Sequence, residues 1–121
     1  MSTGAASRRG PEVFPCPPGL RVVIEANVRA RCPFTGAPDH YDVEIEYVST
    51  GKCVEAHSLA EWLDGFKEAR VSQEELTKAI TEKLKKMLKP EFVCTRLQGG
   101  HGSVFITTES CDSNNPVIQP L

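Results

Sequence analysis

The stretch HYDVEIEYV, residues 40–48, decides the fold, because polar and apolar side chains alternate along it. Its odd-numbered positions are aromatic or aliphatic, and its even-numbered positions from 40 to 46 carry an imidazole or a carboxylate. A period of two is that of a β-strand with one buried face and one solvated face. The stretch therefore predicts a strand of an antiparallel sheet that packs on a core through one face.

The segments on either side of this strand complete an α+β order. Two S-x-x-E capping boxes, which begin at Ser58 and Ser72, each precede apolar residues at helical spacing, and Pro90 ends the second helix. A glycine-rich turn is expected over residues 98–102. Further strand-like runs cover residues 20–28, 91–97 and 103–108. The order ββααββ predicts an antiparallel sheet with two helices on one face.

The two ends of the chain lack this patterning. Residues 1–19 are rich in Ser, Gly, Pro and Ala and predict a flexible arm, and residues 110–121 predict a tail. Between them we expect a single domain over residues 20–109, as suits a chain of 121 residues. Apolar residues make up 40% and charged residues 25%, and this globular balance argues against general disorder.

Five cysteines without a C-x-x-C pair narrow the possible kinds of site. Their odd number leaves at least one thiol without an intrachain partner, and their spacing does not predict a zinc centre, so no metal is expected. The sequence has no signal-peptide pattern and no apolar run long enough to span a membrane. We therefore expect a cytoplasmic protein with mostly reduced thiols and no membrane partner. If the source is a hyperthermophile, an internal disulfide is an alternative, because intracellular proteins of such organisms can contain disulfides.

The segment CPFTGAPD, residues 32–39, leads into the alternating strand and places a thiol and a carboxylate seven residues apart. Two prolines and a glycine keep it out of helix and sheet, which predicts a rigid loop that presents Cys32 and Asp39 to a substrate. A buried cysteine and a turn-forming aspartate are the structural alternative, because both are common in those roles. The residues alone leave both interpretations open.

That segment, together with four further motifs, resembles the QueF family of nitrile reductases, which act on 7-cyano-7-deazaguanine. The four motifs are Val54-Glu55, Ser58-Leu59, Trp62-Leu63 and Gln73-Glu74-Glu75. The resemblance covers about residues 21–109. It implies the tunnelling fold (T-fold), whose subunits join sheets edge to edge into a ring-shaped barrel and so remove exposed sheet edges. It also implies a homo-oligomer of two stacked pentamers with active sites between subunits.

The same resemblance assigns roles to individual side chains. It implies that Cys32 is the nucleophile that captures the nitrile as a thioimide, and that Asp39 protonates the nitrile nitrogen. It implies that Glu55 and Glu74 bind the base, since a carboxylate accepts two hydrogen bonds from a guanine-like edge. Further substrate-binding positions on this basis are Ser58, His57 and Gln73. For Glu74 the structural alternative is a first-turn glutamate that interacts favourably with the helix dipole.

Departures from the reductase pattern fall mainly at cofactor-binding positions. Where the reductases have two lysines that bind the NADPH phosphates, this chain has His57 and Ala60, and a third cationic position aligns with Gln98. Phosphate recognition relies on arginine or lysine. The family histidine beside the recognition glutamate is Gln73 here, and the aromatic residue before it is Ser72. We therefore predict no cofactor, and no G-x-G-x-x-G segment offers another dinucleotide site.

This pattern is similar to the archaeosine-forming, QueF-like branch of tRNA modification, in which ammonia attacks the thioimide in place of hydride. The resemblance implies an amidinotransferase-type enzyme that converts 7-cyano-7-deazaguanine in tRNA to the formamidine, with ammonia as co-substrate. The alternative is an NADPH-dependent 7-cyano-7-deazaguanine reductase of the queuosine pathway, which makes the aminomethyl group. A third interpretation is a T-fold binding protein that forms the thioimide without turning it over.

A tRNA partner requires cations against its phosphates. The candidates are Lys78, Lys83, Lys85, Lys86 and Lys89 on the second helix, with Arg21, Arg29 and Arg31 near the first strand. A solvated helix face is the structural alternative for the lysines. The formal net charge of -2 gives no overall attraction to nucleic acid, so an RNA contact depends on such a local patch.

Overall fold

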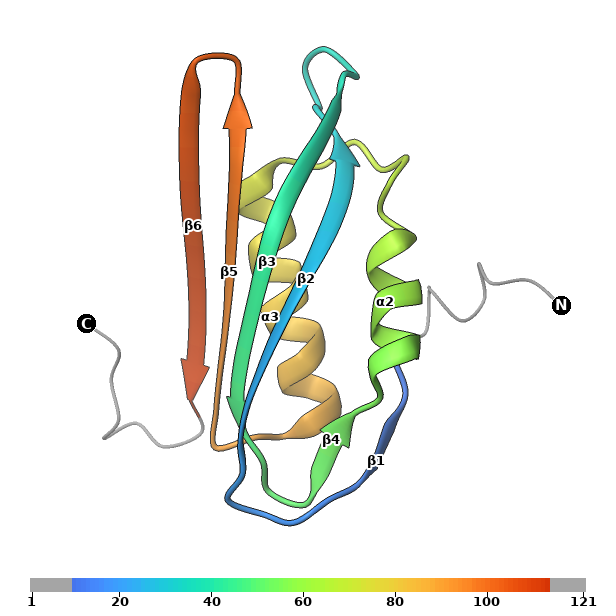
Figure 1. Cartoon of the computed structure of the whole chain (residues 1–121), viewed down its shortest axis with the longest axis vertical. Helices are drawn as coiled ribbons and strands as arrows, with labels where there is room; N and C mark the ends of the chain where they lie inside the picture. Colours follow the sequence, from blue (N-terminus) through green and yellow to red (C-terminus); the bar gives the residue numbers. More distant parts are fainter. Residues whose placement is uncertain (1–9, 114–121) are drawn as a thin grey trace, which may run out of the picture.

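The computed structural model describes residues 10–113, which form a four-stranded sheet, a two-stranded sheet and two helices (Figure 1). The large sheet is antiparallel and has the strand order β2-β3-β5-β6. Its strands are β2 (Arg21–Arg31), β3 (Pro38–Val48), β5 (Phe92–His101) and β6 (Val104–Ser113). The remaining elements are β1 (Val13–Pro15), β4 (Lys52–Val54), α2 (Ala56–Asp64) and α3 (Gln73–Leu88).

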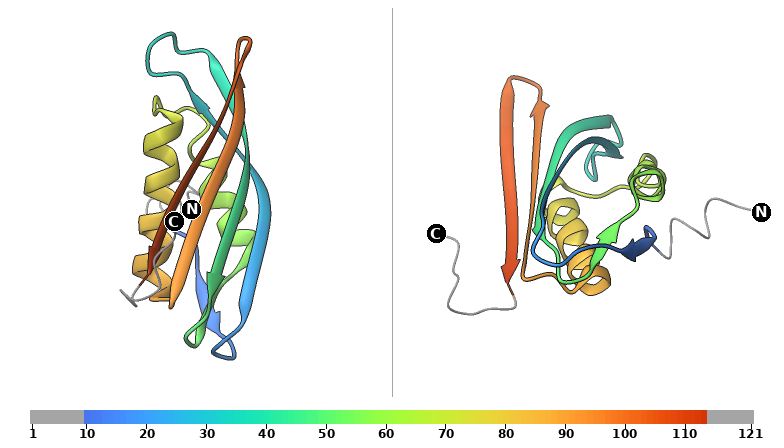
Figure 2. Two further views of the ribbon diagram at one scale, coloured as in Figure 1. Left: turned by 90° about the vertical axis from the view of Figure 1, so that its left-hand side faces the viewer. Right: turned by 60° about the horizontal axis from the view of Figure 1, so that its bottom comes forward.

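Both helices lie on the same side of the large sheet, as the right-hand view of Figure 2 shows. The predicted α+β class and the ββααββ order of the large sheet and helices are confirmed. The small sheet, in which β1 pairs with β4, was not predicted. Neither helix among the described residues is long and apolar enough to cross a membrane.

The core lies between the helices and the sheet face that carries the odd-numbered residues of β3. Tyr41, Val43, Ile45 and Tyr47 are each at most 3% exposed, which confirms the buried face predicted from the alternation. The helices contribute Leu59, Trp62, Leu63, Leu76, Ile80, Leu84 and Leu88 to the same cluster. Full burial of one such aliphatic side chain contributes about 1.5–3 kcal/mol. The contact between helices and sheet is therefore the main source of stability.

One predicted helix start is confirmed and the other is wrong. α3 begins after Ser72, whose Oγ accepts a hydrogen bond from the N–H of Glu75 at 3.1 Å, as the capping box requires. α2 begins one residue after Glu55, which is its N-cap, and not at Ser58. The Glu55 carboxylate accepts from the N–H groups of both His57 and Ser58. Because it satisfies two free donors at once, it takes the place of the predicted serine cap.

The predicted boundaries of the domain also need correction. Strand β1 lies inside the arm predicted over residues 1–19, and β6 continues into the tail predicted from residue 110. The N–H of Glu55 donates to the carbonyl of Glu12 at 2.8 Å, which fastens the segment before β1 to the start of α2. Pairing with β4 thus orders a proline-rich stretch that has no strand periodicity of its own. Residues 1–9 and 114–121 lie outside the described part.

The turn predicted over residues 98–102 is wrong, because residues 98–101 continue β5. The hairpin turns instead at Gly102, whose φ is 65°, and Ser103. Gly99 is required for a different reason, since a Cβ at this position would collide with the ring of Tyr41. The longer strand carries His101 to the end of β5.

Two disulfides contradict the prediction of mostly reduced thiols. Cys16 is bonded to Cys53, and Cys94 is bonded to Cys111. The first bond joins the segment after β1 to β4, and the second joins residues that face each other across β5 and β6. The partners are 37 and 17 residues apart in the chain, so only the strand pairing reveals them. Cys32 remains the free cysteine.

Candidate active site

One end of the subunit collects polar side chains from segments far apart in the sequence. The β2–β3 loop, the start of β3, the start of α3 and the end of β5 lie together at the top of Figure 1. These segments carry Cys32, Asp39, Gln73, Glu74 and His101. Four residues of the predicted site therefore come to one end, and His101 joins them without having been predicted.

Cys32 opens a closed turn that connects β2 to β3. Its N–H donates to the carbonyl of Ala37, and its carbonyl accepts from the N–H of Gly36, both at 2.8 Å. Arg31 Nη1 donates to the carbonyl of Gly36 at 2.9 Å. The φ of Gly36 is 77°, a left-handed conformation that favours glycine. These contacts hold residues 32–37 outside helix and sheet, as the sequence predicts. The predicted loop was too long by two residues, because Pro38 and Asp39 begin β3 and pair with β2.

The connection between α2 and α3 supports the same loop from the side. Arg31 donates its N–H to the carbonyl of Ala69 and accepts from the N–H of Val71 through its own carbonyl. The guanidinium of Arg70 lies against Gly36, where it would collide with an added Cβ. The β2–β3 loop is therefore held by β2 and by the segment that leads into α3.

Local hydrogen bonds favour the thiolate form of Cys32. The hydroxyl of Thr35 and, after it, the N–H groups of Thr35 and Phe34 lower the pKa of the Cys32 thiol from its ordinary value of 9.0. Slight burial and the negative charge of Asp39 act in the opposite direction on this pKa, and they are the smaller causes. A thiolate is the nucleophilic form of cysteine, so the turn itself activates Cys32.

Asp39 lies within electrostatic range of this thiol and is mostly shielded, with 13% of its side chain exposed. The hydroxyl of Tyr41 donates to Asp39 Oδ2 at 3.3 Å, and His101 Nδ1 lies 3.8 Å from Asp39 Oδ1. Burial, followed by the charge of Asp39, raises the pKa of the Tyr41 hydroxyl, so Tyr41 stays a neutral donor. The carboxyl group is thus held between a phenol and an imidazole.

Gln73 is buried and ties the start of α3 to the β5–β6 hairpin. Its Nε2 donates to the carbonyls of Leu97 and Ile106 at 3.1 and 3.0 Å and lies 3.3 Å from Thr108 Oγ1. Its Oε1 lies 2.8 Å from His101 Nε2. Gln73 therefore positions the hairpin and the imidazole, a role that the motif around it does not reveal. For His101, the sequence offers only a histidine beside a glycine pair.

Glu74 differs from its neighbour because it is exposed in the first turn of α3. Among residues 10–113 its carboxylate has no hydrogen-bond or ion-pair partner, so it is available to a ligand. Its charge is one of the smaller causes that raise the pKa of Tyr41, which places it within electrostatic range of the same cluster. A carboxylate at a helix N-terminus is also favoured by the helix dipole.

The other three predicted site residues lie at the opposite end of the folded molecule. Glu55, His57 and Ser58 form the first turn of α2, which begins beside β4 near the bottom of Figure 1. The N–H groups of His57 and Ser58, then the His57 imidazole at 3.0 Å, lower the pKa of the Glu55 carboxyl to about 2. Ser58 Oγ accepts from the N–H of Glu12 at 2.8 Å. Within one subunit these side chains do not meet Cys32.

Comparison with known proteins places this fold and cluster in a family. A family model described as QueF-like protein matches residues 38–110. The chain belongs to the QueF-like family. NADPH-dependent 7-cyano-7-deazaguanine reductases of Thermotoga maritima and Thermotoga petrophila are each 40% identical over 82 residues. The match covers 66% of this chain and spans 60% of the length of these relatives. The Aquifex aeolicus reductase is 37% identical over 62 residues, 51% of this chain and 48% of its own.

A solved structure gives the same fold for this QueF-like chain. The archaeosine synthase QueF-Like, crystallised in the apo form, superposes with a TM-score of 0.75. The match covers 79% of this chain and 96% of that protein, at 20% sequence identity. The likeness confirms the predicted T-fold subunit, and at this identity it shows the fold alone.

The surface of α2 in this QueF-like chain is acidic. The helix contains Glu61 and Asp64 and neither lysine nor arginine. His57 and Ala60, at the positions aligned with the reductase lysines, are both exposed, and the His57 side chain is 98% exposed. Arg29 and Lys67 lie beside this surface, and both pair with Asp64, so the basic group that α2 itself provides is the His57 imidazole.

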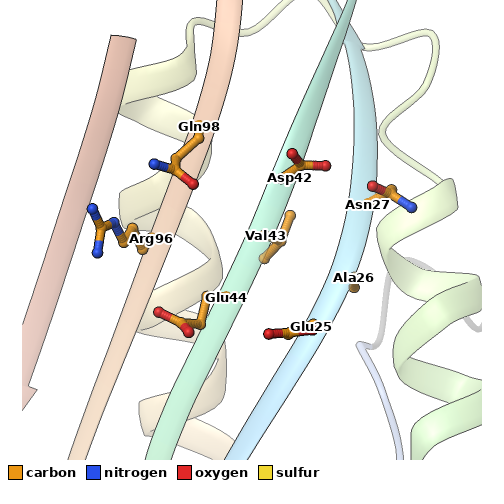
Figure 3. Close-up of a pocket in the computed structure, with 8 residues that line it drawn as sticks. All are labelled: Glu25, Ala26, Asn27, Asp42, Val43, Glu44, Arg96 and Gln98. Carbon is orange, nitrogen blue, oxygen red and sulfur yellow. The ribbon is translucent and has the colours of Figure 1, made fainter.

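The open face of the large sheet has a shallow hollow of ≈ 540 Å³ (Figure 3). Figure 3 shows Glu25, Asp42 and Glu44 around it, with Arg96 and Gln98 on β5. Glu25 pairs with Glu44 across β2 and β3, and Glu44 pairs with Arg96 across β3 and β5. Gln98, the third non-cationic position, pairs with Asp42 across β3 and β5. The hollow that it lines carries three carboxylates and one guanidinium, that of Arg96, and this negative balance is a poor environment for an anionic cofactor.

Most of the potential metal ligands and of the cations predicted to contact tRNA already have partners within the protein. In the described part of the chain, the one group of metal-ligating side chains is Cys94, Glu109 and Cys111, and its two sulfurs are joined in a disulfide. The three arginines proposed for RNA pair with carboxylates: Arg21 with Glu46, Arg29 with Asp64, and Arg31 with Glu68. Two lysines of α3 pair likewise: Lys78 with Glu82, and Lys85 with Asp112. Lys83, Lys86 and Lys89 have no ion-pair partner among residues 10–113.

Proposed function

We propose that this QueF-like chain is an archaeosine synthase-type enzyme. It adds ammonia to the nitrile of 7-cyano-7-deazaguanine in tRNA, through a thioimide on Cys32, to give the formamidine. The observation that carries the proposal is a free thiol whose pKa is lowered by Thr35 and which lies within electrostatic range of Asp39. A second feature is that α2 itself contains no lysine or arginine. The first feature suits nitrile capture, and the second disfavours NADPH.

Capture of the nitrile uses the two side chains of the β2–β3 loop region. The Cys32 thiolate forms a C–S bond to the nitrile carbon, one C–N π bond opens, and the nitrile nitrogen takes a proton from Asp39. Tyr41, which donates to Asp39 Oδ2, orients that carboxyl group. The product of this half-reaction is a thioimide and an Asp39 carboxylate.

Ammonia then completes the reaction without a cofactor. Its nitrogen forms a bond to the thioimide carbon while the C–N π pair moves onto the imide nitrogen. After the added nitrogen has lost its surplus proton, the imide lone pair re-forms the C–N double bond and the C–S bond breaks. Cys32 leaves as a thiolate, and the group that remains is the amidine. No electrons are exchanged with an external reductant.

The NADPH-dependent reductase is the second candidate, favoured by the names of the Thermotoga relatives at 40% identity. That reaction needs a site for several phosphate charges, which arginine or lysine side chains normally bind. In this chain the helix that resembles the one with the phosphate-binding lysines carries Glu61 and Asp64, with His57 as a weak substitute. The neighbouring cations Arg29 and Lys67 are both paired with Asp64. This charge distribution is why we rank ammonia ahead of hydride.

Base binding in this proposal requires more than one subunit. Glu74 lies next to the Cys32 cluster and is available to accept hydrogen bonds from the base edge. Glu55, His57 and Ser58 lie at the other end of their own subunit, so they reach a Cys32 cluster only if it belongs to a neighbour. We therefore retain the proposed ring-shaped homo-oligomer, expected as two stacked pentamers. The outer strands β2 and β6 of the large sheet supply the edges to be joined.

The tRNA partner and the cytoplasmic location belong to the same proposal. With three arginines paired internally, Lys83, Lys86 and Lys89 are the predicted cations left for phosphate on each subunit, and a ring repeats them around its circumference. The two disulfides fit a cytoplasmic tRNA enzyme only in a hyperthermophilic host, since other cytosols keep thiols reduced.

The test is turnover of tRNA that contains 7-cyano-7-deazaguanine, supplied with ammonium or with NADPH, followed by mass spectrometry of the modified nucleoside. We expect the formamidine with ammonium alone and no added NADPH. Formation of an aminomethyl product that requires NADPH would establish the reductase and contradict the ammonia proposal. A Cys32→Ala variant serves as the control that distinguishes enzymatic from solution chemistry.

A further inference from the structure

His101 lies at the end of β5 with one nitrogen toward α3 and the other toward the Asp39 carboxyl. Its Nε2 is 2.8 Å from Gln73 Oε1, and its Nδ1 is 3.8 Å from Asp39 Oδ1. Its ring packs beside the ring of Tyr41, with the centroids 5.8 Å apart. The side chain is 31% exposed, so the imidazole is held in place and still open to a small molecule.

The surroundings of Gln73 determine which nitrogen of His101 carries the proton. The Gln73 amide nitrogen must face the carbonyls of Leu97 and Ile106, because a carbonyl oxygen only accepts hydrogen bonds. The amide oxygen is therefore the atom that faces His101, and it needs a donor. In the neutral imidazole that donor is Nε2–H, which leaves Nδ1 as a lone pair directed to Asp39.

The addition of ammonia requires a proton acceptor, and the Nδ1 lone pair of His101 can serve as one. When ammonia adds to the thioimide, its nitrogen carries a surplus proton, and Asp39 is left as a carboxylate after protonating the nitrile. One proton therefore has to leave the added nitrogen, and one proton has to return to Asp39. A neutral imidazole between the two groups can do both.

We propose that His101 takes the surplus proton from the added ammonia nitrogen and passes it to Asp39. The proton moves from that nitrogen to Nδ1, which gives an imidazolium, and then from Nδ1 to Asp39 Oδ1. The C–S bond breaks as the imide lone pair re-forms the double bond. The cycle ends with neutral His101, protonated Asp39 and the Cys32 thiolate, so every group returns to its starting state. This inference rests on the proposed ammonia reaction.

The distances and the placement of the other histidines agree with this role. A separation of 3.8 Å is bridged by one water or by a small closure, and catalytic contacts commonly tighten when substrate binds. His40 follows Asp39 in β3 and so points to the opposite face of the sheet, and His57 lies in the first turn of α2. His101 is thus the imidazole that contacts the Asp39 cluster.

The test compares His101→Gln and His101→Asn with His40→Gln, an exposed histidine next to Asp39 in the sequence. Glutamine can keep the donor to Gln73 and asparagine resembles the Nδ1 side of the ring, but neither amide takes up a proton. Each variant is measured for capture of the nitrile on Cys32 by intact mass, and for release of the adduct by ammonium or by hydroxylamine. Hydroxylamine is a neutral nucleophile whose adduct gives up its proton to water readily.

We expect both His101 variants to capture the nitrile at the wild-type rate and to release it with ammonium about 100-fold more slowly, a typical general-base effect. Release by hydroxylamine should stay within a few-fold of wild type, and His40→Gln should match wild type throughout. Equal losses in capture and in both releases, or failure of both His101 variants to fold, would make His101 structural and overturn the proposal. Unchanged release by ammonium would also overturn it.

The outcomes separate this proposal from the proposed function. If the wild-type protein makes the formamidine and the His101→Gln variant makes it at the same rate, only the proposed proton transfer is overturned. Wild-type protein that turns over only with NADPH removes the ammonia that His101 would deprotonate, and it overturns both.

Discussion

At the scale of single residues, the reactivity of Cys32 comes from its own turn. No cation contacts the thiol in the described part of the chain, and the causes that lower its pKa are the Thr35 hydroxyl and two N–H groups of the loop. Asp39 lies within electrostatic range of the thiol, since its charge opposes this effect. The proposed nucleophile in the β2–β3 loop and the proposed acid at the start of β3 are thus only a few residues apart in the chain.

The Thr35 hydroxyl provides a test at this scale. Thr35→Val keeps the shape of the side chain and removes the largest cause of the lowered pKa, so the pKa of Cys32 should rise toward its ordinary value of 9.0. The pH dependence of Cys32 alkylation by iodoacetamide measures this pKa, and nitrile capture at neutral pH should slow several-fold. Thr107→Val, on exposed β6, is the matched control. An alkylation profile identical to wild type would show that the hydroxyl does not stabilise the thiolate.

At the scale of elements, the first turn of α2 combines a structural role with a proposed binding role. Glu55 caps the helix by accepting hydrogen bonds from two N–H groups. The resemblance to the QueF family implies that Glu55 also binds the base. A cap already in place holds the carboxylate in one orientation, which suits a ligand approaching from a neighbouring subunit. It also means that loss of activity on changing Glu55 must be separated from loss of the cap.

The pH dependence of stability distinguishes the capping role of Glu55 from its proposed role in base binding. The folded pKa of Glu55 is lowered from 4.5 to about 2, so the stability that its charge provides is present above pH 4.5 and is lost as the pH falls toward 2. Glu55→Gln should therefore lower the melting temperature at neutral pH, and the difference from wild type should shrink in acid. Thermal unfolding between neutral pH and pH 2 measures this, with Glu61→Gln as the control on the same helix. A constant difference across the range would contradict the capping role.

At the scale of the whole molecule, the predicted active-site residues separate into two groups at opposite ends of the subunit. Cys32, Asp39, Gln73 and Glu74 lie at one end, and the first turn of α2 lies at the other. The large sheet has two outer strands, β2 and β6, that are unpaired on one side within the described chain. Both features agree with a proposed ring in which one subunit completes the site of another.

The parts of this structure that the sequence predicted are those fixed by local patterns. The alternation over residues 40–48 predicted β3 and its buried face, and the capping box at Ser72 predicted the start of α3. Cys32 and Asp39 were singled out because they lie seven residues apart in one segment, and their catalytic roles stay predictions. Each of these features depends on residues close together in the chain.

The parts that were missed depend on contacts between distant segments. His101 meets Gln73 across 28 residues, and the two disulfides close across 37 and 17 residues. The predicted turn at residues 98–102 failed because Gly99 serves to admit the Tyr41 ring, a reason that requires the neighbouring strand to be known. The predicted start of α2 at Ser58 was wrong because Glu55 caps the N–H groups of His57 and Ser58, which places Ser58 inside the first turn.

The central claim is that a thioimide on Cys32 is resolved by ammonia. The most direct measurement mixes the protein with tRNA that contains 7-cyano-7-deazaguanine in the absence of ammonium, and follows the adduct by mass spectrometry of the Cys32 peptide. The adduct is then chased with ammonium or with NADPH. The account predicts an adduct that Cys32→Ala does not form, and its conversion to formamidine by ammonium alone. An adduct that persists in Cys32→Ala, or one that only NADPH converts, would contradict it.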